Sequence, residues 1–314
     1  MKNEKMKKFF LLNIILCFFI IFLLYLINIS YKNYTNSLGI SYFNVNKNNV
    51  KVMNLGSSHT YFGIKYPEDI LSYNLAMAAQ NFYYDLKVLE KYSKNLDQEC
   101  VIIIPISIFS FYRGEKLDDI KFNYIDILER KDILNLSYPE YILGKYFFAV
   151  QSSKRLKQGI EYFFKSLLKK SEAPTKILYQ RDLTVLEKEK EAKVTAKEHL
   201  YKWNESKRIG IIQLKKLLKF AENNNFRPIL ITTPQTYLYN EQIGEENYQE
   251  RIYNNILEVE KQLGKKYLYL DYSHDERFEK KLEYFFDDDH LNEKGAEYFT
   301  KILLQDLKNK GYTF

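Results

Sequence analysis

The feature that most constrains this chain is a continuous apolar stretch near its N-terminus, FFLLNIILCFFIIFLLYLINI, residues 9–29. A helix that spans a bilayer needs about 20 such residues, so residues 9–29 are expected to form a membrane anchor. Residues 1–8 carry four lysines against one glutamate, and a basic flank of this kind stays on the cytoplasmic side. We therefore expect a short cytoplasmic tail, one transmembrane helix, and the rest of the chain outside the cell.

A cleaved signal peptide is the alternative to an anchor. The apolar core is too long for one, and no small-residue cleavage site follows it in NISYKNYTNS, residues 30–39. Cys17 follows Leu16, where a lipoprotein signal has a small residue, so lipidation is not expected. Residues 30–47 are rich in Asn and Ser and are expected to form a stalk.

Charge and cysteine content exclude several functions. Of the formal net charge of +7, residues 1–8 supply +3 (four Lys minus one Glu), which leaves +4 for the rest of the chain. This charge is too diffuse to indicate nucleic-acid binding, although it suits weak attraction to an acidic envelope polymer. Outside the anchor the only cysteine is Cys100, so no intramolecular disulfide can form there, and a small buried apolar role is expected.

Residues 48–314 alternate between strand and helix patterns. The predicted strands are short aliphatic runs, as in strands buried on both faces of a parallel sheet, at residues 49–56, 100–107, 227–234 and 266–273. Segments with helical spacing lie at residues 80–95, 205–224 and 245–265. This alternation predicts an α/β domain with a doubly wound, flavodoxin-like parallel sheet.

Residues 111–201 break the alternation and are expected to be a helical insertion. The first part is rich in aromatic residues, and a charged run at residues 187–197 is expected to be a solvated helix face, with His199 solvated beside it. A role as a lid or as a surface against the membrane stays open for this insertion.

The first predicted strand ends in GSSH, residues 56–59. Ligands bind beyond the carboxyl ends of strands in parallel α/β folds. Gly56 permits a sharp turn, and a serine at the start of the next helix has backbone N–H groups nearby that can stabilise an oxyanion. From this stretch alone, Ser58 is equally well a nucleophile or a helix cap.

A nucleophilic serine needs a base, and the chain has four histidines. His59 adjoins Ser58, and neighbouring side chains do not face each other on a helix or strand, so it is a poor partner. His199 lies in the charged run. His274 follows the fourth predicted strand and is a rival candidate for the base.

His290 has the most favourable context, in DDDHLN before a predicted C-terminal helix that Asn292 can cap. Residues i and i+3 approach each other on a turn, so the Asp287 carboxylate can hold one ring nitrogen of His290. Asp289 is expected to point away from His290, and Asp288 is expected to face solvent. No histidine or cysteine cluster accompanies these acids, so no metal and no other cofactor are expected.

The two motifs together, G-x-S after the first strand and D-x-x-H-L-N before the last helix, resemble those of the SGNH/GDSL hydrolase superfamily. The resemblance covers roughly residues 48–110 and 225–308. It implies that Ser58 is the nucleophile, that Asp287 and His290 are the acid and base, and that the backbone N–H groups of Ser58 and Ala79 form the oxyanion hole.

The third block of that superfamily usually contains G-x-N-D after a strand, and this chain has IIIPISIFSFYR at residues 102–113 instead. One oxyanion donor must therefore come from elsewhere, with Ser107 as the candidate, or be absent. Ser57, His59, Gln80 and Ser107 are candidates to line the substrate site.

The anchor and the atypical middle are similar to those of a divergent membrane branch that includes the D-alanyl-lipoteichoic acid transfer protein and alginate O-acetylation proteins. The resemblance implies a membrane-anchored serine esterase or O-acyltransferase that acts on acyl esters of an envelope glycan or a teichoic acid-like polymer, beside a membrane O-acyltransferase. The alternative is a catalytically inactive SGNH-fold subunit that binds or assembles an envelope acylation system. A lipid esterase with an aromatic lid is a third hypothesis.

Overall fold

The structure is a computed structural model, which describes residues 2–37, 47–112, 120–151, 153–168, 183–201 and 206–314. The chain forms two compact units. The first comprises Met1–Tyr42 and Lys121–Tyr179, and the second comprises Phe43–Ile120 and Gln180–Phe314. The predicted anchor and the candidate catalytic residues therefore belong to different units.

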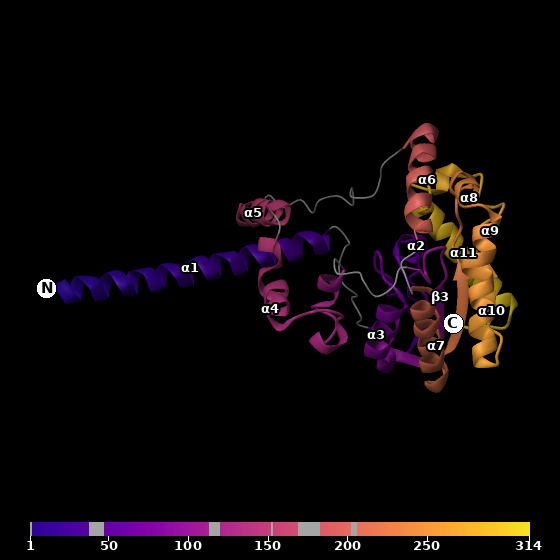
Figure 1. Ribbon diagram of the computed structural model, residues 1–314, viewed down its shortest axis with the longest axis horizontal. Helices are drawn as coiled ribbons and strands as arrows, with labels where there is room; N and C mark the ends of the chain where they lie inside the picture. The colour runs from indigo at the N-terminus through magenta and orange to yellow at the C-terminus, as the bar shows by residue number, and fades with distance from the viewer. Residues whose placement is uncertain (1, 38–46, 113–119, 152, 169–182, 202–205) are drawn as a thin grey trace. The chain divides into compact units, whose positions relative to one another are not determined.

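The first unit is built on the long helix α1, Lys2–Ser37 (Figure 1). Its segment Glu4–Asn33 is long and apolar enough to cross a membrane, and most of that segment is exposed. Helices pack on α1 only near its C-terminal end, where Ile27 and Asn28 are buried. These are α4 (Tyr138–Phe147) and α5 (Ser153–Leu167), accompanied by the 3-10 turns η2 (Lys121–Tyr124), η3 (Arg130–Asp132) and η4 (Phe148–Gln151).

The second unit contains a five-stranded sheet in the order β2-β1-β3-β4-β5, and every neighbouring pair is parallel. The strands are β1 (Val50–Asn54), β2 (Ser72–Asn74), β3 (Leu96–Pro105), β4 (Arg227–Thr232) and β5 (Tyr269–Asp271). Four of them coincide with the predicted aliphatic runs. The flavodoxin-like, doubly wound α/β prediction is confirmed, and its switch point lies where β1 pairs with both β2 and β3.

Helices flank this sheet (Figure 1). They are α2 (Ser58–Gly63), α3 (Phe82–Tyr92), α6 (Val185–Leu200), α7 (Ser206–Asn223), α8 (Tyr237–Ile243), α9 (Glu245–Tyr248), α10 (Asn254–Leu263) and α11 (Glu293–Asn309), with the short turns η1 (Ser93–Asn95), η6 (Gln249–Tyr253) and η7 (Leu282–Tyr284). α11 buries Phe299, Leu303 and Leu307 in a cluster with apolar side chains of β1, β3 and β4. As predicted, the Asn292 side chain caps α11, accepting the Gly295 N–H at 2.9 Å. Cys100 is buried, also as predicted.

α6 belongs to the α/β unit, although its sequence lies in the predicted insertion. Its outer surface is exposed, as expected of a charged run. Its buried residues recur at helical spacing and form one stripe of four side chains: Lys188, Ala192, Ala196 and His199. The expectation that His199 is solvated is therefore wrong, because the ring lies on the face of α6 that packs on α8.

Candidate active site

Gly56 and the two serines make a sharp turn from β1 into α2. Gly56 has φ +108°, and a Cβ there would lie 2.0 Å from Cγ of Pro105, so only glycine fits without displacement. Ser57 is the N-cap residue but makes no side-chain cap hydrogen bond, and Ser58 is the first helical residue. The alternative in which Ser58 caps the helix is therefore wrong. Ser58 is half-buried at the carboxyl end of the sheet.

The DDDH segment forms a tight loop before α11. Phe285 and Leu291 pair across its ends in an antiparallel bridge, and the Phe286 N–H donates to the His290 carbonyl at 3.1 Å. Inside the loop, Oδ1 of Asp287 accepts the His290 N–H at 2.7 Å and the Asp289 N–H at 3.1 Å. The Asp287 side chain thus fixes the backbone that carries His290.

Two carboxylates hold the ring of His290. Its Nδ1 lies 2.9 Å from Oδ2 of Asp287, the partner that the i, i+3 spacing predicts. It also lies 2.8 Å from Oδ1 of Asp289, so the expectation that Asp289 points away is wrong. The reason is the closed loop, in which adjacent side chains converge on one ring. Nε2 of His290 is buried and has no hydrogen-bond partner in the described part of the chain.

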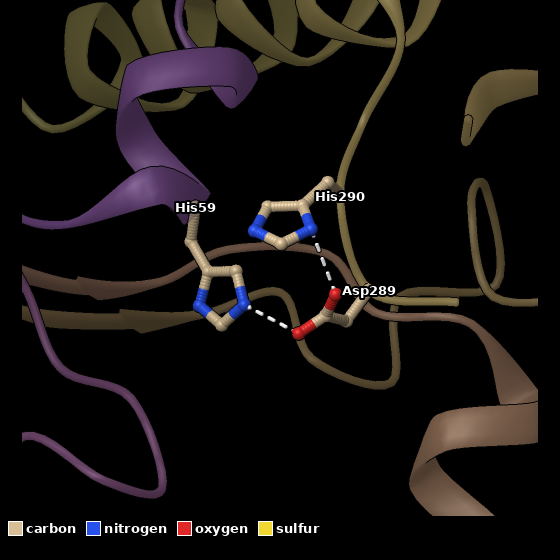
Figure 2. Close-up of side chains that lie close together, drawn as sticks. All are labelled: His59, Asp289 and His290. Carbon is tan, nitrogen blue, oxygen red and sulfur yellow. Dashed lines mark hydrogen bonds and ion pairs between the residues drawn. The ribbon is translucent and has the colours of Figure 1, made fainter. Parts of the chain in front are cut away.

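His59 contacts the second oxygen of Asp289, the one that does not face His290. Figure 2 shows Asp289 between the two rings, with His59 projecting from α2 and His290 from the loop. Nε2 of His59 lies 2.9 Å from Oδ2 of Asp289, and its Nδ1 lies 3.1 Å from the Ser107 hydroxyl. His59 and Phe62, both on α2, place their ring centroids 5.0 and 5.5 Å from that of His290. The His290 ring therefore packs against the helix that begins at Ser58.

Charge sets the protonation of this cluster. Burial of the His290 ring lowers its pKa, but the neighbouring charges of Asp289 and Asp287 outweigh burial and hold that pKa well above the usual value. Burial would raise the pKa of Asp289, but His290 and His59 hold it well below its usual value. Asp289 is thus an anion at neutral pH, and resting His290 carries a proton on Nδ1.

Asp288 differs from its two neighbours. It is buried, which corrects the expectation that it faces solvent. Burial and the charges of Asp289 and Asp287 raise the pKa of Asp288 to about 8, so its carboxyl group is mostly neutral at pH 7. Its Oδ1 accepts from the Thr195 hydroxyl at 3.3 Å, and its carbonyl accepts from the Thr236 hydroxyl.

α6 supports the loop through three side chains on one face. Nζ of Lys188 donates to the Phe285 carbonyl at 2.7 Å, Thr195 bonds Asp288, and Nδ1 of His199 lies 3.7 Å from Oδ2 of Asp289. At the other end, the buried Arg251 donates to the carbonyl of His199 at 3.3 Å. α6 is therefore tied both to the loop and to the segment before α10.

The candidate oxyanion donors have distinct environments. Ala79 has φ +61°, in the left-handed region that favours glycine. Within the described residues, the N–H groups of Ser58 and Ala79 have no hydrogen-bond acceptor. The Ser107 N–H, by contrast, donates to the Ser110 hydroxyl at 2.8 Å.

Ser57, Gln80 and Ser107 line a small pocket of about 10 Å³, close to the space that one water needs. The Gln80 side chain donates to Asp85 at 2.7 Å, and Asp85 also accepts the Gly56 N–H at 2.8 Å. Burial raises the pKa of Asp85 to about 7, against the opposing effect of these two hydrogen bonds. Gln80 thus fixes the turn at Gly56 as well as lining the pocket.

The rival base His274 lies in a different cluster, with Glu279 at 3.0 Å, Asn240 at 3.2 Å and Glu245 at 3.3 Å. No hydrogen bond in the described part of the chain joins His274 to Ser58 or to the DDDH loop.

Among the residues that the structure describes, two sets of side chains are spaced closely enough to hold a metal ion: His59, Asp289 and His290, and the three acids of the loop. In the first set, each Asp289 oxygen already faces a ring nitrogen at hydrogen-bond distance. Such an arrangement suits proton sharing between a carboxylate and two imidazoles.

No protein-family model and no curated protein matches the chain. A search of solved structures finds similarity to a crystal structure from Bacteroides fragilis NCTC 9343 described as a "putative acylhydrolase", with 13% sequence identity and a TM-score of 0.40. The similarity covers 89% of this chain and 96% of the other.

Proposed function

We propose that this chain is a membrane-anchored serine esterase or O-acyltransferase. Ser58 is the nucleophile, His290 the base, and Asp287 and Asp289 the carboxylates that orient His290. One observation carries the proposal: Nδ1 of His290 lies between two carboxylates while its Nε2, beside α2, has no partner. An imidazole held at one nitrogen and open at the other is the arrangement that activates a serine hydroxyl.

The proposed reaction begins with the neutral form of His290. The Ser58 oxygen attacks the ester carbonyl, and its proton moves to Nε2 of His290. The N–H groups of Ser58 and Ala79 stabilise the negative oxygen of the tetrahedral intermediate. The bond to the alkoxy group then breaks, and the leaving oxygen takes the proton from His290. Water or a sugar hydroxyl, activated by the same histidine, removes the acyl group from Ser58.

The substrate class follows from the anchor and from the motif resemblance. α1 is long enough to span a bilayer, and its first two turns are basic, so the α/β unit is proposed to lie outside the cell. We propose acyl esters of an envelope glycan or teichoic acid-like polymer as substrates, with a membrane O-acyltransferase as a partner.

Fluorophosphonate labelling of the full-length protein in detergent tests the catalytic proposal. Wild type is expected to label, and Ser58→Ala and His290→Ala are expected not to. Ser93→Ala is the matched control, because this half-buried serine lies before β3 at the opposite end of the sheet, and within the described residues its hydroxyl donates to the Glu90 carbonyl alone. Folded wild type that does not label would refute the proposal.

A non-catalytic binding or assembly subunit is the second candidate, and Ser107 favours it. The Ser107 N–H already donates to the Ser110 hydroxyl, and the Ser107 hydroxyl lies 3.1 Å from Nδ1 of His59, so the backbone N–H at this third-block residue is not available to an oxyanion. In that case, Ser58→Ala would leave envelope acylation in cells unchanged, whereas deletion of the gene would abolish it.

A further inference from the structure

The C-terminal end of α1 is buried by the other helices of the first unit. Near this end, those helices expose an apolar surface to their outside. On α4 and the turn after it, apolar residues at spacings of three and four are exposed. Apolar residues at the C-terminal end of α5 are exposed as well. We call these residues the collar surface: Leu143, Tyr146, Val150, Phe164, Leu167 and Leu168. Phe164, Leu167 and Leu168 are 58, 63 and 66% exposed, more than isolated surface residues of a water-soluble domain require.

The collar surface lies at a defined depth along α1. Residues 9–29 extend about 30 Å as a helix, which matches the hydrocarbon thickness of a bilayer. α5 crosses α1 close to the end of that stretch, because a Cβ on Gly159 would lie 2.9 Å from the Ile27 carbonyl oxygen. Figure 1 shows α5 nearly end-on where it passes α1, so the two helix axes cross. If α1 spans the bilayer, α5 lies at its surface.

The side chains of α1 begin to make polar contacts with the rest of the first unit at Asn28, close to where α5 crosses the helix. Oδ1 of Asn28 accepts the Ala149 N–H at 3.0 Å, and Lys32 pairs with Asp126 at 2.5 Å. N-terminal to Ile27, the side chains of α1 are mostly exposed and apolar. Tyr146 packs beside Tyr25 with ring centroids 6.4 Å apart, and tyrosines of this kind gather at membrane–water interfaces. Protein therefore packs around α1 from Ile27 onward, whereas the apolar side chains before Ile27 are mostly left exposed.

α5 has the composition of an interfacial helix. Residues 153–167 contain four basic side chains and one acidic side chain, and the basic Lys157 and Lys165 are exposed. Apolar residues at positions 156, 160, 163, 164 and 167 form one stripe along the helix; Lys165 lies opposite that stripe, and Lys157 lies at its edge, beside Phe164. A basic polar face opposite Phe and Leu is typical of helices that lie in the plane of an anionic membrane.

We propose that the collar surface is inserted into the headgroup region of an anionic lipid bilayer, in the leaflet from which the C-terminal end of α1 emerges. The chain then contacts the membrane in two ways, with α1 across the bilayer and α4 and α5 on its surface. The inference is independent of the catalytic proposal and rests on α1 crossing the bilayer.

The test uses the full-length protein in vesicles of phosphatidylglycerol and phosphatidylcholine. Leu167→Cys, in a Cys17→Ala background, is labelled with an environment-sensitive fluorophore, and nitroxide lipids report its depth. Lys165→Cys is the matched control, because Lys165 is also exposed and lies on the same turn but on the polar side. Both changes replace exposed side chains and should leave packing intact.

We expect quenching at position 167 to be several-fold stronger than at position 165, and strongest with a nitroxide near the headgroup. Label on the native Cys17, exposed on α1, should instead be quenched best by a nitroxide deep in the acyl chains. If the label on Cys17 is quenched but the labels at positions 167 and 165 are quenched equally and weakly, the collar proposal is overturned while α1 remains a membrane anchor. Loss of quenching at Cys17 would overturn both. Neither result would bear on Ser58.

Discussion

Replacing Asp289 by Asn should shift the pH dependence of serine reactivity to lower pH. Only neutral His290 can accept the Ser58 proton, and in the wild type the charges of Asp289 and Asp287 hold the pKa of His290 well above 6.5. Labelling of the wild type should therefore rise with pH and reach half its maximum above pH 6.5. Asp289→Asn keeps the shape of the side chain but removes the charge that raises the pKa of His290 most.

The size of the shift follows from the contacts. Asp289 lies 2.8 Å from Nδ1 of His290, and an adjacent opposite charge moves a pKa by about 1–3 units. The midpoint should fall by a comparable amount, which corresponds to about 1.4–4 kcal/mol. The maximum rate at high pH should also fall, because a base of lower pKa is a weaker proton acceptor. Asp287 still holds the ring, so labelling should survive.

The assay is the rate of fluorophosphonate labelling from pH 5 to 9.5, with the full-length protein. Asp288→Asn is the matched control from the same loop: the pKa of Asp288 is about 8, so its carboxyl group is already mostly neutral where the wild-type rate begins to rise. An Asp289→Asn midpoint equal to that of the wild type would refute the assignment of Asp289 to His290.

Three further changes test the surroundings of the site. His59→Ala should lower stability by about 1–3 kcal/mol, because one oxygen of buried Asp289 loses its closest partner; chemical denaturation of the second unit measures this, and an unchanged midpoint would contradict it. Gly56→Ala should abolish labelling and lower the melting temperature, because the new Cβ collides with Pro105 at φ +108°; normal labelling would count against the described turn. The pKa of Asp85 is raised to about 7 in the folded state, so the folded protein keeps a proton that the unfolded chain releases near pH 4, and stability falls as pH rises from about 4 to 7. Asp85→Asn should remove this loss, so the variant should gain melting temperature relative to wild type between pH 5 and 8, and parallel curves would refute the assignment.

Local patterns predicted most of the fold. Aliphatic runs indicated four strands because strands buried on both faces must be apolar throughout. The strand β2, only Ser72–Asn74, was not among those runs because three residues give no periodicity. The i, i+3 spacing predicted the contact between Asp287 and His290, which depends on a single turn.

The rest of the site depends on contacts that the sequence does not encode locally. His59 and Asp289 are 230 residues apart and meet only because β1 and the DDDH loop reach the same edge of the sheet. The rule that adjacent side chains diverge holds for regular helices and strands, and it failed for Asp289 in a closed loop. The burial of His199 could have been predicted from the sequence, since Lys188, Ala192, Ala196 and His199 recur at spacings of four, four and three and so share one helix face. The dense charge around that stripe favoured a fully solvated helix instead.

The hydrogen bonds of His59 and Ser107 limit which groups remain for the oxyanion. Asp289 is an anion, and its two oxygens accept hydrogen bonds from Nε2 of His59 and Nδ1 of His290. The Ser107 hydroxyl lies 3.1 Å from Nδ1 of His59; it donates there when that ring is neutral and accepts there when the ring is protonated. The Ser107 N–H is committed to the Ser110 hydroxyl in either case. That N–H therefore cannot replace the missing third-block asparagine, and in the proposed reaction the N–H groups of Ser58 and Ala79 hold the oxyanion without it.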